Sequence, residues 1–537
     1  MGLVDRLKKG WRGLMQKTAS ATGIARSYKT VFELGNVPSY QEFYDFGIYI
    51  WKALYKGFYR AWHIIPAPTI RSANATREVY RMNIPKAVCA ELAGLVWGEE
   101  CTINVSMDGR QGEEPDPLNA FVNHVLNCNA FREKMQESIE QGLALGGSAL
   151  KVWHDIQRDS EGNEIPGTDR ISIGYAMADQ FVPVSWDNAQ VKECVFISRI
   201  AKGGWYYTRL EWHTWDGMTY TVKNELFRSE MQKGAASDSQ DILGIRVPLA
   251  EVYPLLDEET VIPVGESLFT YWRTPIANNL DDNSPLGMSI YGNALETLHS
   301  LDICFDSFVR EFRLGKKRII VPARAVRTVI DPATQQVRRY FDPCDETYEA
   351  LASDDPADLK ITDNSVELRV EEHVAAMNAF LNVLCLQLGF SSNTFSFDSK
   401  GGIKTATEVV SENSKTYKTI KTVQNQLRPA VEHLVRNIID VAILYDMEWE
   451  GRKVADLARN GYHINVVYDD GVTQDRQTNL NEGVMLVGAG LLSKYTFLTD
   501  PKYGQGLTPE QAEAELQRIK AEQPGKVDAL AIFGTAE

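Results

Sequence analysis

Residues 289–315, SIYGNALETLHSLDICFDSFVREFRLG, carry the clearest helical pattern in the chain. Their apolar positions recur at spacings of 4, 4, 3, 4, 3 and 4, which keeps them on one face of a helix. At about 1.5 Å per residue such a helix would be about 40 Å long. The pattern predicts a long helix that ends at Gly315, with this apolar face: Ile290, Ala294, Leu298, Leu301, Phe305, Phe308 and Phe312.

Two more helices are predicted downstream. A second helix is expected over residues 371–390, with Val374, Met377, Leu381, Leu384 and Leu388 on one face. Residues 316–370, between the two helices, carry strand and turn signals. A third pattern predicts a helix from Thr405 to Trp449, kinked at Pro429 because proline lacks the N–H that would bond to the preceding turn.

The preceding part of the chain reads mainly as strands. Residues 148–227 are enriched in Val, Ile, Tyr and Trp and are punctuated by turn residues, which predicts a sheet. Asp216-Gly217 predicts a two-residue hairpin turn between strands 209–215 and 218–222. Asp116-Pro117 is a typical helix start, and residues 3–17 predict a basic amphipathic helix. The fold class is therefore α+β.

Length and composition limit the number of domains and the classes of function that the chain can have. The chain has 537 residues, which at roughly 150 residues per domain predicts three or four domains. It has 56 Lys and Arg against 72 Asp and Glu, a net charge of −16. Because DNA affinity comes largely from phosphate contacts by Lys and Arg, this acidic balance argues against a protein that grips DNA indiscriminately.

The cysteines and the apolar segments indicate the compartment. The seven cysteines are far apart and include no Cys-x-x-Cys pair, which predicts no disulfide framework and a reducing compartment. Residues 43–65 are apolar and aromatic, but Lys52, Lys56 and Arg60 interrupt them. A membrane span needs about 20 largely uncharged residues, so we expect none, and we also expect no signal peptide.

Catalytic and metal-binding motifs are incomplete. Residues 287–292, GMSIYG, are one residue too long for the nucleophile elbow of a serine hydrolase. Residues 401–405, GGIKT, lack the upstream glycine and the Gly-Lys step of a phosphate-binding loop. The eight histidines form no His-x-x-x-His pair. We expect no enzyme, no cofactor and no metal site.

Two blocks of opposite charge stand next to each other in the insertion. Residues 316–339 hold seven bases and one acid, and residues 342–372 hold eleven acids and two bases. Such blocks suit contact between identical neighbours, since the basic part of one copy can meet the acidic part of the next. A merely solvated, charged insertion explains the charges equally well.

Several stretches resemble portal proteins of long-tailed (siphovirus-type) bacteriophages. They are SPLGMSIY at 284–291, REF at 310–312 through KKR at 316–318, FSFD at 395–398, KTATEV at 404–409 and NSKTY at 413–417. None is a catalytic motif, and their specificity lies in their order along the chain. The resemblance is strongest from about residue 278 to 445.

This resemblance implies a multi-domain phage-portal architecture with a wing, a two-helix stem, a β-rich clip, a long kinked helix and a helical crown. The implied segments are an N-terminal helical arm (1–40), the first part of the wing (41–288), stem helices (289–315 and 371–390), the clip (316–370), the tunnel loop (391–404), the second part of the wing (405–473), and the crown with the C-terminal tail (474–537).

The resemblance also implies a function in the virion. Identical subunits, usually about twelve, would form a ring at one capsid vertex, through which double-stranded DNA is packaged and later ejected. The implied partners are terminase, a head–tail adaptor, and the major capsid and scaffolding proteins. Assembly would take place in the cytoplasm of the bacterial host.

Two groups of candidate site residues follow from the resemblance. In the tunnel loop the DNA-facing positions are Asn393, Thr394, Phe395, Lys400 and Lys404, with the two lysines as sparse phosphate contacts. In the clip, contacts to neighbours or docking partners are expected from Arg324, Arg327, Arg338, Arg339, Asp354 and Asp355.

Two other function classes stay open at this stage. One is a packaging-associated or tail-associated hydrolase, which needs a phosphate loop or a paired acid and base. The other is a membrane-peripheral scaffold that uses the basic helix of residues 3–17. The preferred interpretation of Lys415, Lys418 and Lys421 is a solvated helix face, and a DNA contact is the less favoured one.

Overall fold

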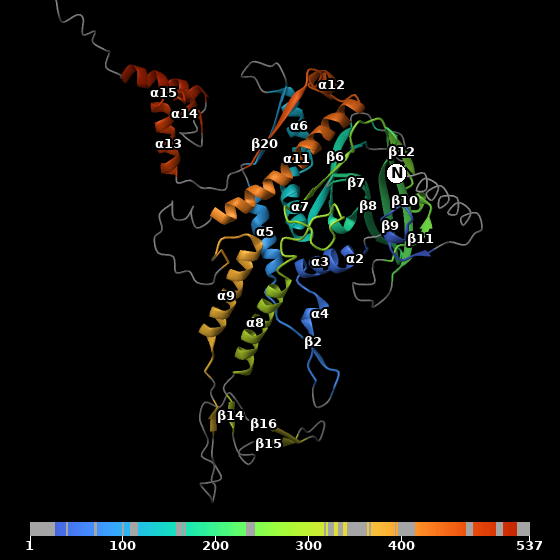
Figure 1. Ribbon diagram of the computed structural model, residues 1–537, viewed down its shortest axis with the longest axis vertical. Coiled ribbons are helices and arrows are strands. Elements are labelled where there is room, and N and C mark those ends of the chain that lie inside the picture. Colours follow the sequence, from blue (N-terminus) through green and yellow to red (C-terminus); the bar gives the residue numbers. More distant parts are fainter. Residues whose placement is uncertain are drawn as a thin grey trace, which may run out of the picture.

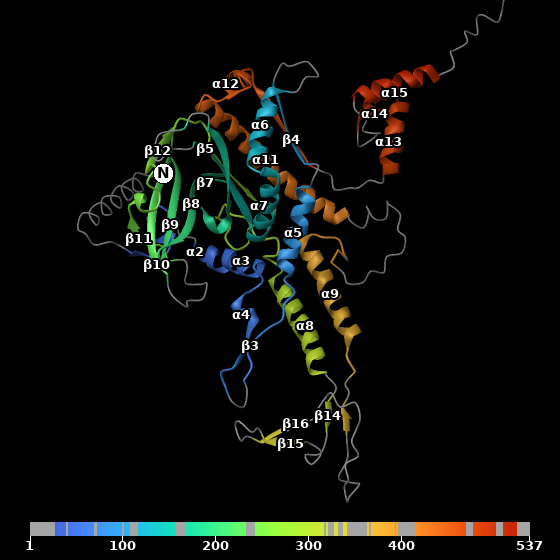
Figure 2. The ribbon, with the colours of Figure 1, turned by 180° about the vertical axis from the view of Figure 1, so that it is seen from behind.

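The computed structural model describes most of the chain. The described residues are 27–38, 41–68, 72–98, 101–107, 116–156, 165, 168–188, 190–231, 242–315, 318–320, 327–330, 337–340, 362–364, 367–392, 394–395, 414–468, 476–500 and 509–522. Figures 1 and 2 show a body of sheets and helices from which helices α8 (Leu295–Leu314) and α9 (Val370–Leu388) project side by side. The basic helix expected over residues 3–17 lies outside the described residues.

Two antiparallel sheets form the centre of the body. The larger has the order β1-β11-β10-β9-β8-β7, with β12 also paired to β10, and the smaller has the order β13-β5-β6. The predicted strand region, 148–227, is thereby confirmed. The strands are β1 (Ser27–Tyr28), β5 (Gly147–Asp155), β6 (Arg170–Met177), β7 (Phe181–Asp187), β8 (Gln190–Lys202), β9 (Trp205–Asp216), β10 (Thr219–Glu230), β11 (Gly244–Val247), β12 (Glu259–Ile262) and β13 (Phe269–Arg273).

The predicted hairpin exists, but its turn is shifted by one residue. Asp216 pairs with Thr219, so the loop is Gly217-Met218 and the expected Asp216-Gly217 turn is wrong. Gly217 has a φ of 65°, as the first loop position of a type II′ turn requires. The shift places Trp215 opposite Tyr220, and their rings pack 5.0 Å apart.

Four helices cover the smaller sheet and its surroundings. Helices α7 (Phe131–Leu145) and α11 (Ser414–Leu444) lie against β5, and α5 (Ile84–Val96) packs on α7. Helix α6 (Pro117–Cys128) starts as predicted, because an oxygen of Asp116 accepts a hydrogen bond from the Leu118 amide at 2.9 Å. Many side chains of this layer are fully buried, including Leu118, Met135 and Ile438.

Helix α11 is shorter at its C-terminal end than the sequence pattern predicts. It ends at Leu444 rather than Trp449, because Asp446 adopts a left-handed φ of 52° and the chain turns into strand β18 (Glu448–Trp449). Pro429 stands inside the helix, as expected. The expected start at Thr405 lies outside the described residues.

Short elements complete the described chain. They are α2 (Gln41–Phe43), α3 (Tyr49–Tyr55), α4 (Arg60–His63), β2 (Ile64–Pro66) with β3 (Thr76–Glu78), β4 (Thr102–Met107) with β20 (Tyr462–Val467), β19 (Arg452–Lys453), which pairs with β18, and α12 (Val454–Leu457). Helices α13 (Arg476–Gly488), α14 (Lys494–Thr499) and α15 (Pro509–Glu522) follow, and α14 packs on both of the others.

The first projecting helix begins later than the sequence pattern predicts. Helix α8 spans Leu295–Leu314, so the expectation of a helix from Ser289 is wrong. The preceding segment is held by contacts to the body: the Ile290 amide donates to the Leu143 carbonyl at 3.0 Å, and Thr274 Oγ1 donates to the Met288 carbonyl at 2.5 Å. The Met288 carbonyl would be the first acceptor of a helix that began at Ser289, so its bond to Thr274 competes with that start.

Two glycines permit this arrangement. Gly146 ends α7 with a φ of 94°, and a Cβ added there would lie 2.1 Å from the Gly287 carbonyl oxygen. A Cβ added at Gly287 would lie 2.1 Å from the Gly146 carbonyl oxygen. Only glycine at both positions allows the two backbones to approach so closely.

We expect Gly146→Ala to destabilise the fold by more than about 2 kcal/mol. A matched control is Gly217→Ala, since Gly217 also has positive φ but a Cβ there would meet nothing within 4 Å. The control carries only the conformational penalty of about 1–2 kcal/mol. Urea unfolding of both variants measures the difference. Equal losses would show that the close approach does not limit the fold.

Candidate functional site

Helices α8 and α9 (Val370–Leu388) are joined at their far ends by an ionic cluster. The Glu311 carboxylate accepts hydrogen bonds from the Arg369 amide at 2.9 Å, from Arg369 Nη2 at 2.9 Å and from His373 Nε2 at 2.7 Å. Hydrogen bonds from Arg369 and His373 lower the pKa of Glu311 from its usual 4.5 to about 2. Glu311 therefore stays charged at neutral pH and ties the end of α8 to the start of α9.

A strap, defined as residues 59–68 and 72–82, contacts another side of α8. Asp306 accepts two hydrogen bonds from Arg77, at 2.8 and 2.6 Å, and one from the Tyr80 amide at 3.1 Å. One turn earlier, Asp302 accepts from the Met82 amide at 3.0 Å and lies 3.1 Å from His63 Nε2. Contacts with Arg77 and Tyr80 hold the pKa of Asp306 below its usual range, although burial opposes this.

The predicted tunnel loop begins in a fixed turn after α9. Thr394 Oγ1 donates to the Ser391 carbonyl at 2.6 Å, and the Phe395 ring packs edge-on against Phe390 with centroids 5.2 Å apart. Thr394 is exposed and Phe395 is half-buried against the core. Of the predicted DNA-facing positions, Asn393, Lys400 and Lys404 lie outside the described residues.

Helix α11 holds the base of this loop, which the sequence analysis missed. The Ser391 amide donates to Thr416 Oγ1 at 2.9 Å, and Thr419 Oγ1 donates to the Gly389 carbonyl at 2.7 Å. Lys415 Nζ reaches the Leu386 carbonyl at 3.1 Å. The segment leaving α9 and the segment entering α11 therefore lie side by side. Single Ser and Thr residues are common in any sequence, so nothing in the sequence indicates that these hydroxyl groups bind a segment far away in the chain.

The predicted clip contacts are placed only in part. Arg327 begins β15 (Arg327–Ile330), and Arg338 and Arg339 lie in β16 (Val337–Tyr340), with Arg339 opposite Thr328. Strand β14 (Arg318–Ile320) pairs separately with β17 (Thr362–Asn364). Arg324, Asp354 and Asp355 lie outside the described residues. The backbone pairing confirms strands in the insertion, but it does not test the expected contacts.

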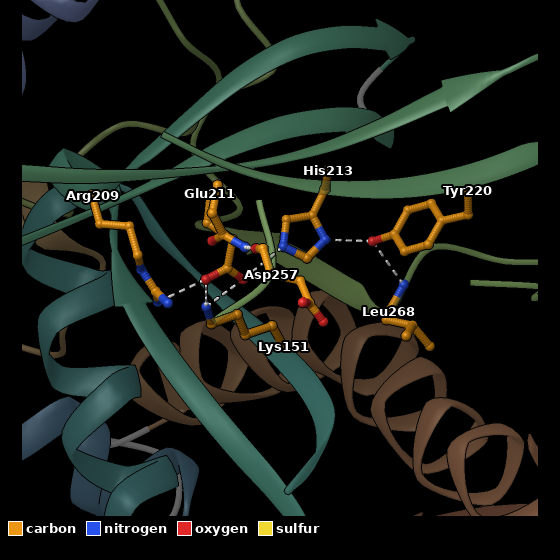
Figure 3. A network of polar contacts seen from close by, with 8 residues as sticks. Lys151, Arg209, Glu211, His213, Tyr220, Asp257 and Leu268 are labelled. Atoms are coloured by element: carbon orange, nitrogen blue, oxygen red, sulfur yellow. Dashed lines mark hydrogen bonds and ion pairs between the residues drawn. The ribbon is translucent and has the colours of Figure 1, made fainter. Parts of the chain in front are cut away.

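A buried polar network joins the two sheets and has the residue types of a catalytic relay (Figure 3). Glu211 binds Lys151 at 2.6 and 2.7 Å and Arg209 at 2.8 Å. His213 lies 2.9 Å from Glu211 and 2.5 Å from the Tyr220 hydroxyl, which accepts from the Leu268 amide at 3.2 Å.

The pKa shifts in this network favour a fixed distribution of charge, with Glu211 ionised and His213 neutral. Burial alone would raise the pKa of Glu211, but Lys151, His213 and Arg209 hold it well below its usual value. Burial lowers the pKa of His213, so a neutral ring can donate from Nε2 to Glu211 and accept at Nδ1 from Tyr220. The exposed fractions of Glu211, His213 and Tyr220 are 9%, 4% and 0%, so these three side chains belong to the core.

A hollow of about 1050 Å³ lies between α11 and the β12–β13 connection. At its wall the Glu266 carboxylate is 3.1 Å from His433 Nε2 and 3.9 Å from Arg436 Nε. Burial lowers the pKa of His433, and Glu266 opposes this shift. Among the described residues, no three His, Cys, Asp or Glu side chains gather as metal ligands would.

We expect Glu311→Ala to loosen the junction between α8 and α9. The Arg369 amide loses its acceptor, so its hydrogen exchange at pH 7 should become faster than in the control Glu296→Ala, which alters an exposed carboxylate of the same helix. Because the pKa of Glu311 is lowered to about 2, its stabilising effect is complete above pH 4.5 and is lost as the pH falls through about 2. Unfolding midpoints at pH 7, 4 and 2 check this. Identical exchange in both variants would contradict the role of Glu311.

Comparisons with known proteins place the chain in a family. The family model described as "Phage portal protein, SPP1 Gp6-like" matches residues 52–527. Among the described helices, none is both long enough and apolar enough to cross a bilayer. A comparison with curated proteins finds no match.

Two solved structures are similar to the chain at low identity. One is the neck of an empty GTA particle computed with C6 symmetry, 12% identical over 78% of this chain and 89% of that chain, with a TM-score of 0.39. The other is the virion of a native gene transfer agent (GTA) particle, 10% identical over 78% of this chain and 88% of that chain, with a TM-score of 0.36.

The resemblance to portal proteins is confirmed by the family model, while the narrower assignment to long-tailed phages stays a prediction. The match covers well over half of the sequence. The chain therefore belongs to the SPP1 Gp6-like family of phage portal proteins.

Proposed function

We propose that copies of this chain form a ring at one capsid vertex of a long-tailed phage, and that double-stranded DNA enters and leaves the capsid through it. The family match over residues 52–527 carries this proposal. Heterologous contacts that close on themselves give a ring, and the resemblance to portal proteins implies about twelve copies. The role is structural and non-enzymatic, and the buried state of the Glu211–His213–Tyr220 network is consistent with it.

The projecting part of the chain supplies the channel. In this proposal α8 and α9 are the stem, and β14 to β17 belong to the clip, on which terminase and the head–tail adaptor dock. Arg324, Arg327, Arg338 and Arg339 would meet acidic groups such as Asp354 and Asp355 of neighbours or partners. Helices α13 to α15 would form the crown, and the sheets with α11 the wing.

The tunnel loop, residues 391–404, would face the DNA. Its first residue, Ser391, and the preceding Gly389 are anchored on α11 by Thr416 and Thr419, so the loop starts at a fixed place. A chain with a net charge of −16 offers few phosphate contacts, and fewer contacts mean weaker, less salt-dependent binding. Such a wall lets a duplex slide, with Lys400 and Lys404 as sparse contacts.

The ring itself is the first test. We expect negative-stain images of the purified protein to show annular particles with a central hole wide enough for a double helix, and light scattering to give the mass of a closed oligomer. A protein that stays monomeric at every concentration and also inside assembled particles would contradict the proposed function. ATPase and peptidoglycan-cleavage assays on the same sample test the hydrolase alternative.

The two loop lysines allow a test of the channel wall. We expect Lys400→Ala with Lys404→Ala to leave ring formation intact and to reduce packaging or DNA retention, because phosphate contacts are lost. The control is Lys418→Ala with Lys421→Ala on the exposed face of α11. The measurement is packaged DNA per particle. Unchanged packaging and retention in the loop variant would contradict the proposal that Lys400 and Lys404 contact DNA.

A further inference from the structure

The larger sheet exposes apolar and acidic side chains next to each other at β12. We define the acidic edge as residues 254–261. Its two leucines and its valine are 37% to 61% exposed, and they are Leu255, Leu256 and Val261. Three exposed carboxylates stand between them, at Asp257, Glu258 and Glu259. Over residues 247–272 the sequence has five acids and no Lys or Arg, so this margin is acidic throughout.

Strand β12 has one open backbone edge. It pairs with residues 220–223 of β10, and in the described part of the chain it has no second strand partner. Figures 1 and 2 show it at the outer margin of the body. An open strand edge can pair with other chains. The carboxylates discourage pairing with another acidic copy, but they leave the leucines exposed to water.

The sequence before Ser27 has the complementary character. Residues 1–26, which lie outside the described residues, hold six Lys and Arg and one Asp. We call residues 3–17 the basic segment. It is expected to form an amphipathic helix about 22 Å long, with Leu7, Trp11 and Leu14 on its apolar face. The basic segment therefore offers an apolar face flanked by cations, which matches the acidic edge in both respects.

The strand register directs the chain before Ser27 toward the acidic edge. Strand β9 occupies one side of β10, so β11 and β12 share the other side. Ser27 and Arg228 both stand opposite Ile245, and β1 runs parallel to β10, so the chain before Ser27 continues toward the lower residue numbers of β10. Val261 pairs seven residues farther in that direction, a distance of about 23 Å. Residues 18–26 can span about 30 Å, which is enough to bring the basic segment there.

We propose that the basic segment docks as a helix on the acidic edge of its own chain. Its apolar face covers the two leucines and Val261, and its cations meet the three carboxylates. Burial of apolar area and pairing of opposite charges both favour this contact. A membrane is the less favoured occupant, because binding of the basic segment to lipid leaves the acidic edge uncovered. The contact lies within one copy, so this inference goes beyond the proposed ring and does not depend on it.

Hydrogen exchange of the full chain tests the docking. Trp11→Glu places a charge on the apolar face of the basic segment, so the amides of residues 257–262 should exchange at least about fivefold faster than in the unaltered protein. The control is Gln16→Glu, which adds the same charge on the opposite face of the expected helix and should have little effect. Equal exchange in all three proteins would overturn the docking.

Disulfide formation identifies the chain on which the basic segment docks. The variant carries Leu7→Cys and Val261→Cys. The control carries Leu7→Cys and Val467→Cys, since Val467 is 41% exposed on β20. After mild oxidation, mass spectrometry of the digested monomer should find the linked peptides in the variant and not in the control. A link that occurs only in covalent dimers would assign the basic segment to a second copy and overturn docking within one chain.

Vesicles of phosphatidylcholine and phosphatidylserine test the membrane alternative. We expect the unaltered protein and the Trp11→Glu variant to sediment with these vesicles equally little, because the basic segment is occupied by the acidic edge. Sedimentation of the unaltered protein alone, together with equal exchange at residues 257–262 in both proteins, would assign the basic segment to a lipid surface and overturn the inference.

Discussion

Three carboxylates on α8 fix the direction in which the helix pair leaves the body. Asp302 and Asp306 bind the strap, and Glu311 binds the start of α9. At the far end apolar packing is too sparse to fix this direction, because Phe312 and Leu314 are 45% and 55% exposed. Hydrogen bonds to ionised groups are short and directional, so they set an angle that sparse packing would leave free. The two-helix projection in Figure 1 therefore combines apolar packing, with Leu301, Leu381 and Leu384 buried, and ionic contacts at the far end.

The buried network around Glu211 solves a related problem inside the body. Burying an ion pair is costly unless its geometry is good and its remaining hydrogen-bonding groups are satisfied. Lys151 comes from the smaller sheet, whereas Glu211, His213 and Tyr220 come from the larger, and Tyr220 also binds the backbone next to β13. The network thus ties the two sheets in one relative orientation. The resemblance to a catalytic relay is one of composition, since here the same residue types hold two sheets together within the core.

The sequence predicts those features that depend on neighbours along the chain. The periodicity of α9, the cap at Asp116 and the existence of the β9–β10 hairpin are local, and the structure confirms them. The start of α8 is not local, because Leu143 and Thr274 bind the backbone of residues 288–290 and delay the helix. The predicted register of the hairpin is wrong for another reason, because Gly217 can occupy either position of a two-residue loop. The loop base at Thr416 and Thr419 depends on hydroxyl pairings across 25 to 30 residues, which no periodicity encodes.

Charge is distributed unevenly between the projecting helix pair and α11. Like-charged copies repel one another at distances up to about the Debye length of 8 Å, so association is least opposed where the facing surfaces carry no charge. Helix α9 has such a surface, and it stands on the projecting helix pair rather than on the body. The exposed lysines 415, 418 and 421 lie instead on α11, close to the base of the loop. Lys415 Nζ bonds to the Leu386 carbonyl, so this group of cations begins where the uncharged face of α9 ends.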